Sequence, residues 1–296
     1  MEYPTTISIL VAAVGLIIGS FVGASVWRLR ARQLHLDKKD GEKIRKSDEH
    51  QVAKLQKKSL GKDRSVCLHC GHQLAWYDLV PLVSWLSLRG KCRYCHKSIG
   101  NFEPVIELSM AVFFVASYLF WPYPLVTALD LAQFVLWLVA GTGLAVLFVY
   151  DMRWYLLPNV IVFPLIGISG LYAFTILVQQ QFAWSSIVSI IYGCAILSGL
   201  YYLIYVLSRY NWVGFGDVKL GLALALLLAD WQLCLLALFL ANFIGTVIYL
   251  PLILSGSVKR GAHIPFGPLL ISGWLVSGLF GADIISWYLT ITLGTV

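Results

Sequence analysis

Long apolar runs separated by short polar breaks dominate the chain. The first run, Ile7 to Trp27, is followed at once by Arg28, Arg30 and Arg32. A helix needs about 20 apolar residues to cross the hydrocarbon core of a bilayer, and this run has that length. No small-residue cleavage site precedes the arginines, so the pattern predicts a first transmembrane helix and not a removable signal peptide.

Further apolar runs follow residue 103, and each is predicted to form a transmembrane helix. They cover Pro104–Trp121, Leu125–Val149, Leu157–Val178, Trp184–Leu207, Asp217–Ala229, Trp231–Leu254 and Pro268–Leu289. The run from Asp217 is short, and the last run is interrupted by Gly281 and Asp283. The predicted fold class is therefore an all-α polytopic membrane protein with about eight transmembrane helices.

Residues 28–103 form the one sizeable polar segment of the sequence. Its first half, His35 to Arg64, mixes Lys, Asp, Glu and Gln with few apolar residues, a pattern that fits a short exposed helix or a mobile linker equally well. We therefore divide the chain into a first transmembrane helix at 1–27, a basic loop at 28–103 and a membrane domain at 104–296.

Composition and charge agree with this organisation. Hydrophobic residues make up 59% of the 296 positions and charged residues 12%, whereas soluble domains average about 45–50% and about 25%. The net charge of +7 is concentrated, because residues 28–97 hold 17 of the 22 Lys and Arg. A basic loop between membrane helices follows the positive-inside rule, which predicts a cytoplasmic loop and no nucleic-acid partner.

Counting membrane crossings brings two acidic residues to one side. With the N-terminus outside, the first helix delivers the basic loop to the cytoplasm. The third helix then ends there with Asp151 and Arg153, and the sixth begins there with Asp217 and Lys219. The two aspartates are therefore predicted to lie at similar depth at the cytoplasmic face.

The basic loop carries two Cys-x2-Cys pairs. Cys67 pairs with Cys70 and Cys92 with Cys95, and 21 residues separate the two pairs. This spacing is typical of a tetrahedral zinc site with four thiolate ligands. Such a set leaves no open coordination position, so the zinc ion would be structural and would fold a loop with little core of its own.

Disulfides or a redox pair are the alternative interpretations of these cysteines. Disulfides persist in oxidising compartments, whereas the loop is predicted to be cytoplasmic. His69, His72 and His96 are spare ligand candidates beside a complete set of four cysteines. Cys194 and Cys234 lie within apolar runs and are predicted to be small buried residues.

Asp151 and Asp217 also have simple structural interpretations. Asp217 could be the N-cap of its helix, and Asp151 could be an interfacial acid paired with Arg153. Acids at membrane depth are costly, however, and commonly mark functional sites. Gly214 and Gly216 are predicted to let Asp217 approach another chain segment closely.

Other acids near the predicted spans have less demanding positions. Asp130 and Asp230 are predicted to lie at helix ends on the opposite side, where an exposed acid costs little. Glu103 and Glu107, at the start of the second span, suit helix-dipole or supporting roles.

Two aspartates held within a few ångströms cannot both ionise cheaply, so the pair would share one proton. That arrangement suits hydrolysis of a peptide bond, with one carboxylate activating water and the protonated partner polarising the scissile carbonyl. It also suits proton or cation movement in a transporter, and spacing does not separate the two. Lys219 and Arg153 either tune the pair or anchor helix ends at lipid headgroups.

Several motifs occur in a fixed order along most of the chain. They are Gly19-Ser-Phe, the stretch Asp78–Cys92, Pro104-Val-Ile-Glu-Leu108, Asp151-x6-Pro158-Asn159, Gly214-Phe-Gly-Asp-Val-Lys-Leu220 and Ile264-Pro-Phe-Gly-Pro268. Together they resemble the type IV prepilin peptidase family, membrane aspartic peptidases with a Gly-x-Gly-Asp motif.

The resemblance implies cleavage of the short basic leader of prepilin-like proteins, after a Gly, at the cytoplasmic face of the bacterial inner membrane. The substrate would be a prepilin or pseudopilin with a hydrophobic helix that approaches through the lipid bilayer. The resemblance makes Asp151 and Asp217 the catalytic pair. It assigns zinc binding, as in many members, to Cys67, Cys70, Cys92 and Cys95.

Many members of the family also methylate the new N-terminal amine with S-adenosylmethionine. No glycine-rich cofactor loop marks residues for this cofactor in the sequence. The first cysteine pair reads Cys-Leu-His-Cys where members usually have Cys-Pro-x-Cys, and the insertion Arg30–Ser65 is longer and more charged than usual. Both departures lie in the loop tied to methyl transfer.

Two other functional classes stay open on the sequence. One is a transporter or pilus-assembly scaffold that uses the aspartate pair for ion binding. The other is a membrane thiol oxidoreductase built on the cysteine pairs.

Overall fold

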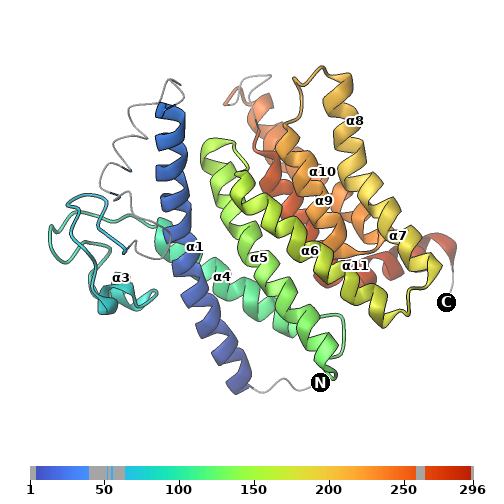
Figure 1. The fold of residues 1–296 in the computed structure, drawn as a ribbon, viewed down its shortest axis with the longest axis horizontal. Helices are drawn as coiled ribbons and strands as arrows, with labels where there is room; N and C mark the ends of the chain where they lie inside the picture. The colour runs from blue at the N-terminus through green and yellow to red at the C-terminus, as the bar shows by residue number, and fades with distance from the viewer. Residues whose placement is uncertain (1–4, 40–51, 53–54, 56–63, 258–263, 295–296) are drawn as a thin grey trace. The chain divides into compact units, whose positions relative to one another are not determined.

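The protein is helical throughout the residues that the computed structural model describes, which are 5–39, 52, 55, 64–257 and 264–294. These residues contain helices and two isolated β-bridges but no strand. The chain divides into two compact units, Met1–Leu119 and Phe120–Val296 (Figure 1). Most of the insertion at 31–66 lies outside the described residues, as do Lys259 and Arg260.

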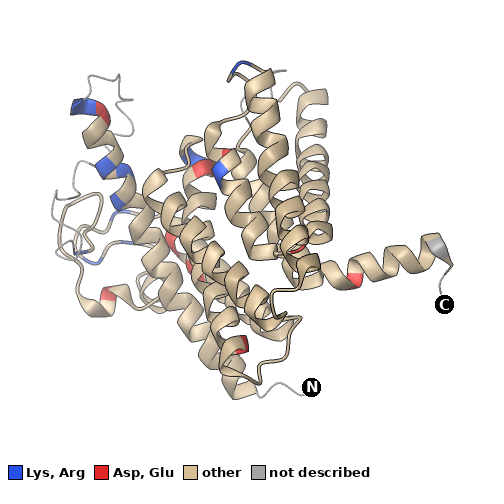
Figure 2. Cartoon of the chain, turned by 45° about the vertical axis from the view of Figure 1, so that its right-hand side comes forward, with Lys and Arg blue, Asp and Glu red and all other residues tan. Residues whose placement is uncertain are grey.

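The first unit is built on helices α1 (Thr5–Lys39) and α4 (Phe102–Leu119), which pack against each other. Helix α1 continues well past the predicted membrane boundary at Trp27, because Arg, Gln, Leu and Lys favour helix in water as well. A side-chain hydrogen bond from Gln33 to Asp37, one turn on, supports this extension. The basic residues of α1 gather at its C-terminal end (Figure 2).

Two glycines set the close approach of α1 to α4. A Cβ on Gly15 would lie 2.7 Å from the Cα of Ala111, and one on Gly19 would lie 2.5 Å from the Cα of Glu107. The spacing Gly15-x3-Gly19 is a small-residue motif that allows membrane helices to pack backbone to backbone. Gly19 also belongs to the Gly19-Ser-Phe motif, whereas Gly15 lies outside every motif named above.

The second unit contains the remaining helices (Figure 1). They are α5 (Ala128–Trp154), α6 (Asn159–Gln179), α7 (Trp184–Cys194), the π-helical turn η2 (Ala195–Gly199), α8 (Leu200–Leu207), α9 (Phe215–Leu228), α10 (Trp231–Leu254) and α11 (Phe266–Leu293). Helix α7, the turn η2 and helix α8 follow one another without a break and cover the single span predicted at Trp184–Leu207.

Helix α9 is the centre of the second unit. It contacts α6, α7, α8, α10, α11 and η2, and Leu220, Ala223, Leu224 and Ala225 along it are fully buried. Its 14 residues measure about 21 Å, less than the roughly 30 Å hydrocarbon core. Seven longer helices in the described part of the chain have the length and hydropathy of membrane spans. The eighth expected span is thus a short helix enclosed by long ones.

Helix α11 extends past the last predicted span. The interruption of the apolar run at Gly281 and Asp283 does not end the helix, because α11 runs continuously from Phe266 to Leu293. A Cβ on Gly281 would lie 2.5 Å from the Cδ2 atom of Leu233 in α10. Gly281 therefore provides a close helix contact and not a break.

Asp130 and Asp230 both act at helix starts. Asp230 is the N-cap of α10 and accepts from the backbone of Gln232 and Leu233. Asp130 forms a capping box with Thr127 at the start of α5 and also accepts from Gln179. Asp130 is buried and not exposed as expected, and these donors offset the cost of its burial.

Replacing Gly19 with Ala is expected to destabilise the protein, because the new methyl group would meet the backbone of α4. Overpacking of this kind costs roughly 1–3 kcal/mol. The matched control is Gly23→Ala in the same helix, where a Cβ meets nothing within 4 Å. Thermal unfolding in detergent measures both variants, and equal melting temperatures would contradict the close contact.

Candidate functional site

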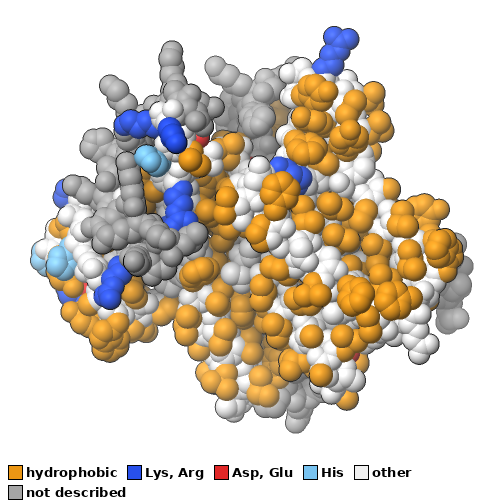
Figure 3. Space-filling model, in the orientation of Figure 1, with side chains coloured by type: hydrophobic (Ala, Val, Ile, Leu, Met, Phe, Trp, Pro, Cys, Tyr) orange, Lys and Arg blue, Asp and Glu red, His pale blue; other side chains and the backbone are white. Residues whose placement is uncertain are grey.

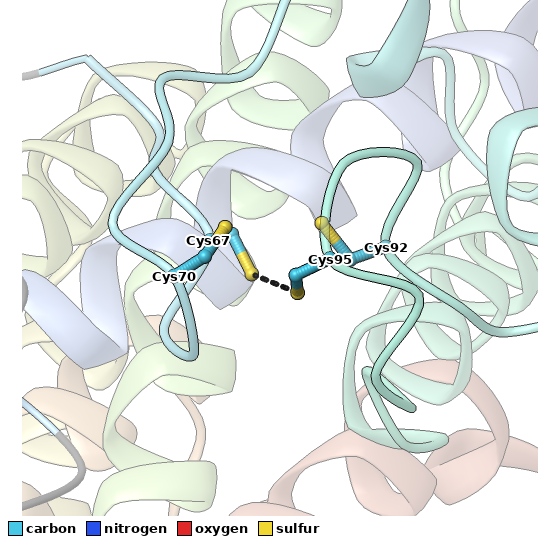
Figure 4. Close-up of side chains that lie close together, drawn as sticks. All are labelled: Cys67, Cys70, Cys92 and Cys95. Carbon is cyan, nitrogen blue, oxygen red and sulfur yellow. Dashed lines mark hydrogen bonds between the residues drawn. The ribbon is translucent and has the colours of Figure 1, made fainter.

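The four loop cysteines converge in the first unit. The Sγ atoms of Cys67, Cys70, Cys92 and Cys95 all lie within 4.8 Å of one another. Figure 4 shows the side chains pointing inward from two turns, with the Sγ atoms of Cys67 and Cys95 3.9 Å apart. Sulfurs at the corners of a tetrahedron with Zn–S bonds of about 2.3 Å stand about 3.8 Å apart. The cluster therefore fits a zinc ion after small adjustments.

The two turns that carry these cysteines have the same backbone structure. The N–H of Gly71 donates to the carbonyl of Cys67, and the N–H of His96 donates to the carbonyl of Cys92. Both Gly71 and His96 have positive φ angles, +76° and +56°. Each turn is closed by an isolated bridge between the residue before its first cysteine and the residue six after that cysteine. The Leu-His sequence of the first turn leaves this geometry intact.

The spare histidines make other contacts. A ring nitrogen of His69 lies 3.1 Å from the carbonyl oxygen of Ser98, and the ring of His72 lies 3.7 Å from that of Tyr94. The metal-ligand cluster found in the described residues contains the four cysteines alone. Cys234 is buried and Cys194 half-buried in the second unit.

Asp78 lies between the two cysteine pairs and connects this segment to the turn that carries Cys92 and Cys95. Its carboxylate accepts from the Nε of Arg93 at 2.8 Å and from the hydroxyl of Tyr94 at 3.2 Å. Partial burial acts to raise the pKa of Asp78, but the hydrogen bonds from Arg93, the Ala75 N–H and Tyr94 outweigh it and lower that pKa. Asp78 is therefore a charged cross-link within the cysteine loop.

The two candidate catalytic aspartates lie on segments of the second unit that pack against each other. Asp151 lies near the C-terminal end of α5, is 5% exposed, and accepts a hydrogen bond of 3.0 Å from the backbone N–H of Gly267. Asp217 is the third residue of α9, and the side chain of Leu157 packs against both Gly216, next to Asp217, and Gly267. Gly214 is the N-cap of α9, so the interpretation of Asp217 as the N-cap is wrong.

Close packing around the aspartates involves Gly216, as expected, and also Gly267. A Cβ on Gly216 would lie 3.1 Å from Leu157, whose side chain also faces Gly267. A Cβ on Gly267 would lie 2.8 Å from the Oδ2 of Asp151, so no side chain fits there without moving the carboxylate. Nothing local in the sequence indicates this role of Gly267, because its contact with Asp151 spans 116 positions.

Lys219 links the two aspartate motifs. Its ammonium group donates to the Oδ1 of Asn159 at the start of α6 and lies 5.3 Å from the ring centres of Phe163 and Phe215. Asn159 belongs to the motif that begins with Asp151, so this bond ties the first turn of α9 to the Asp151 motif. Arg153, by contrast, lies 5.9 Å from the ring centre of Trp154 on its own helix.

Tyr201 of α8 packs at the start of α11. It is buried, and its ring centre lies 5.3 Å from that of Phe266, next to Gly267. Few other charged residues occur along the helices of the second unit (Figure 2).

Glu103 and Glu107 belong to the first unit and are distant in sequence from either aspartate. Glu103 accepts from the indole N–H of Trp27, and Glu107 accepts from the backbone N–H of Leu82. Both therefore contribute to packing within the first unit.

These features define a polytopic membrane protein with a buried aspartate, Asp151, a half-buried one, Asp217, and a four-cysteine cluster that fits a metal ion. The chain matches the model of the bacterial peptidase A24 N-terminal domain over residues 13–121 and that of the type IV leader peptidase family over 138–250. A prepilin leader peptidase/N-methyltransferase of Aeromonas salmonicida is 31% identical over 96% of this chain and 94% of that protein. One from Pseudomonas aeruginosa is 28% identical over 97% and 95%.

The chain therefore belongs to the type IV leader peptidase family. It is a peptidase and a multi-pass protein of the bacterial inner membrane. No solved structure matches it.

Purified protein is expected to contain about one equivalent of zinc, since four thiolates hold a single ion. Cys92→Ser is expected to lower the zinc content well below one equivalent, because it removes a buried ligand. Cys194→Ser, in a membrane helix outside the cluster, is the control and should retain zinc. Elemental analysis measures the metal, and little zinc in the unsubstituted protein would contradict the site.

Proposed function

We propose that this protein cleaves the leader peptide of type IV prepilin-like proteins by aspartic peptidase chemistry, with Asp151 and Asp217 as the catalytic pair. The observation that carries the proposal is the packing of the segments that hold these two residues, 66 positions apart, through Leu157 and the Lys219–Asn159 bond beside the N-terminus of α11. The names of the relatives, prepilin leader peptidases, supply the substrate class.

The chemistry follows from two carboxylates that share one proton. The ionised carboxylate takes a proton from water, and the water oxygen attacks the scissile carbonyl carbon. The protonated carboxyl donates to the carbonyl oxygen. When the tetrahedral intermediate collapses, the C–N bond breaks and the leaving amine takes up a proton from the pair.

The protein's own contacts would hold this pair in position. The Gly267 N–H fixes the Asp151 carboxylate at the positive end of the dipole of α11. Lys219 and Asn159 hold the first turn of α9, and with it Asp217, against the Asp151 motif. Lys219 is therefore a positioning residue in this proposal.

The site is proposed to face the cytoplasm, with the N-terminus of the chain outside. Support comes from the positive-inside rule, since Arg28, Arg30 and Arg32 follow the first membrane run. The substrate is a prepilin or pseudopilin with a basic leader and a hydrophobic helix. Its helix approaches through the bilayer, and the cut falls after the Gly that precedes it.

N-methylation of the new N-terminus is proposed as a second activity, on the basis of the relatives' names. S-adenosylmethionine would supply the methyl group, and we assign no residues to it. Cys67, Cys70, Cys92 and Cys95 would hold a structural zinc ion. In functional terms we propose a first transmembrane helix at 1–27, a zinc-binding loop at 28–103 and a membrane peptidase domain at 104–296.

Asp151→Asn and Asp217→Asn are each expected to lower the rate of prepilin cleavage by at least about 10²–10⁴-fold, because each removes one proton-transfer group. Asp283→Asn is the matched control, since Asp283 is exposed in α11. Cleavage is followed in proteoliposomes by the mass of the processed prepilin. Full cleavage by both dyad variants would contradict an aspartic mechanism and leave ion binding as the role of the pair.

Gly267→Ala is expected to lower cleavage by roughly 10²-fold, because a Cβ 2.8 Å from Oδ2 displaces the Asp151 carboxylate. Gly170→Ala in α6 is the control, since its Cβ would meet nothing within 4 Å. Comparing kcat with KM separates a displaced carboxylate from weakened substrate binding. A Gly267→Ala protein with unchanged kcat would show that this contact does not orient the pair.

A further inference from the structure

The segment between the two cysteine pairs exposes large apolar side chains. It comprises the 3₁₀ turn η1 (Trp76–Leu79) and the short helix α3 (Val83–Ser87). Trp76 is 79% exposed, Val83 62% and Leu86 64%. Figure 3 shows hydrophobic side chains gathered where Figure 1 places α3, with basic and histidine side chains nearby. Such exposure is unusual for a water-soluble loop and indicates a binding surface.

A hydrogen bond fixes the depth of this segment against α4. The backbone N–H of Leu82 donates to the Oε2 of Glu107 at 2.8 Å. Helix α4 has 18 residues, about 27 Å, so nearly its whole length is needed to cross the hydrocarbon core. Glu107 lies five residues after the start of α4 at Phe102, which is about 7.5 Å along the helix. Leu82 is therefore held beside the membrane-crossing part of α4.

Helix α1 gives a second, independent measure of the same depth. The backbone of Glu107 packs against Gly19, where a Cβ would lie 2.5 Å from the Cα of Glu107. Gly19 precedes Arg28, the first basic residue of α1, by nine positions, or about 13.5 Å. Figure 1 likewise shows α3 level with the middle part of α1 and not with the C-terminal end of α1.

The side chain of Trp85, in the middle of α3, contacts the segment just before α4. The indole N–H of Trp85 donates to the carbonyl of Gly100, two residues before α4 begins. The ring of Trp85 also packs on Gly90, whose φ is +69°. Helix α3 therefore lies between the level of Glu107 and the start of α4. This range matches the depth of about 5–10 Å at which interfacial helices bury their apolar face.

Backbone strain shows that the position of Leu82 is specified. Leu82 has φ +56° and ψ −45°, and the N–H of Val83 bonds the carbonyl of Pro81 across it, which is a γ-turn. Such conformations are unfavourable and persist when surrounding contacts hold them. Here the bond to Glu107 is that contact. It also satisfies an acid that would otherwise be costly at this depth.

We propose that Trp76–Ser87 is seated in the membrane, with Trp76, Val83 and Leu86 in contact with lipid at the boundary of headgroups and acyl chains. The exposed basic residues that follow, Arg89, Lys91, Arg93 and Lys97, then lie at the level of anionic headgroups. The zinc cluster is thereby held at the membrane surface, and the exposed apolar side chains have lipid as their partner.

The test uses the full-length protein in nanodiscs of phosphatidylethanolamine and phosphatidylglycerol. A photoreactive benzophenone amino acid replaces Leu86, and adducts are identified by mass. The positive control carries the same group at Val105, a 58% exposed residue of α4. The negative control carries it at Gln73, an exposed residue of the turn that holds Cys67 and Cys70. Leu86 is expected to give about as much lipid adduct as Val105 and at least about tenfold more than Gln73.

Two results would overturn the proposal. One is a Leu86 adduct yield no higher than that of Gln73 while Val105 reacts with lipid. The other is an adduct at Leu86 to protein in place of lipid, which would make the segment a protein-docking surface. Glu107→Ala, with zinc content as the check of folding, is expected to reduce lipid adducts at Leu86 but not at Val105. If that variant loses zinc, the comparison among Leu86, Val105 and Gln73 still decides.

Discussion

A backbone N–H donating to a carboxylate within a membrane helix is the interaction on which both units depend. In the second unit Gly267 donates to Asp151, and in the first Leu82 donates to Glu107. A bilayer offers no water to satisfy such an acid, so a neighbouring segment must supply the donor. In one case the donor is the start of a long helix beside the proposed catalytic pair, and in the other it is a strained turn of the cysteine loop.

The short helix α9 follows from the same constraint. The proposed catalytic pair requires the first turn of α9 to hold Asp217 beside Asp151. The backbone N–H and C=O groups of α9 must also all be hydrogen-bonded within the protein. A helix of 14 residues does this only when longer helices enclose it, and the burial of Leu220, Leu224 and Leu227 shows that they do. Outside the hydrocarbon core, the cysteine loop has few apolar residues to bury, and a metal ion held by the four converging cysteines would take the place of a core.

Much of this structure could be predicted from sequence, because membrane spans and Cys-x2-Cys pairs are local signals. The positions of the long helices and the convergence of Cys67 with Cys95 are examples. The contact of Gly267 with Asp151 could not, since nothing local to either residue indicates a partner 116 positions away. The length of α1 was also missed, because hydropathy reports where a helix leaves the membrane and not where it ends. Gly281 left the end of the last helix uncertain, because glycine occurs both at helix breaks and at close helix contacts.

The contact between α9 and the π-helical turn sets the direction in which Asp217 points. A Cβ on Gly221 would lie 2.2 Å from the carbonyl oxygen of Leu197, so only this face of α9 can meet that turn. Asp217 precedes Gly221 by four residues and shares its face. One residue inserted between them would rotate the carboxylate by about 100° away from Asp151. The four-residue spacing from Asp217 to Gly221 therefore fixes the direction of the Asp217 side chain around the axis of α9. Helix α9 can become longer only after Gly221.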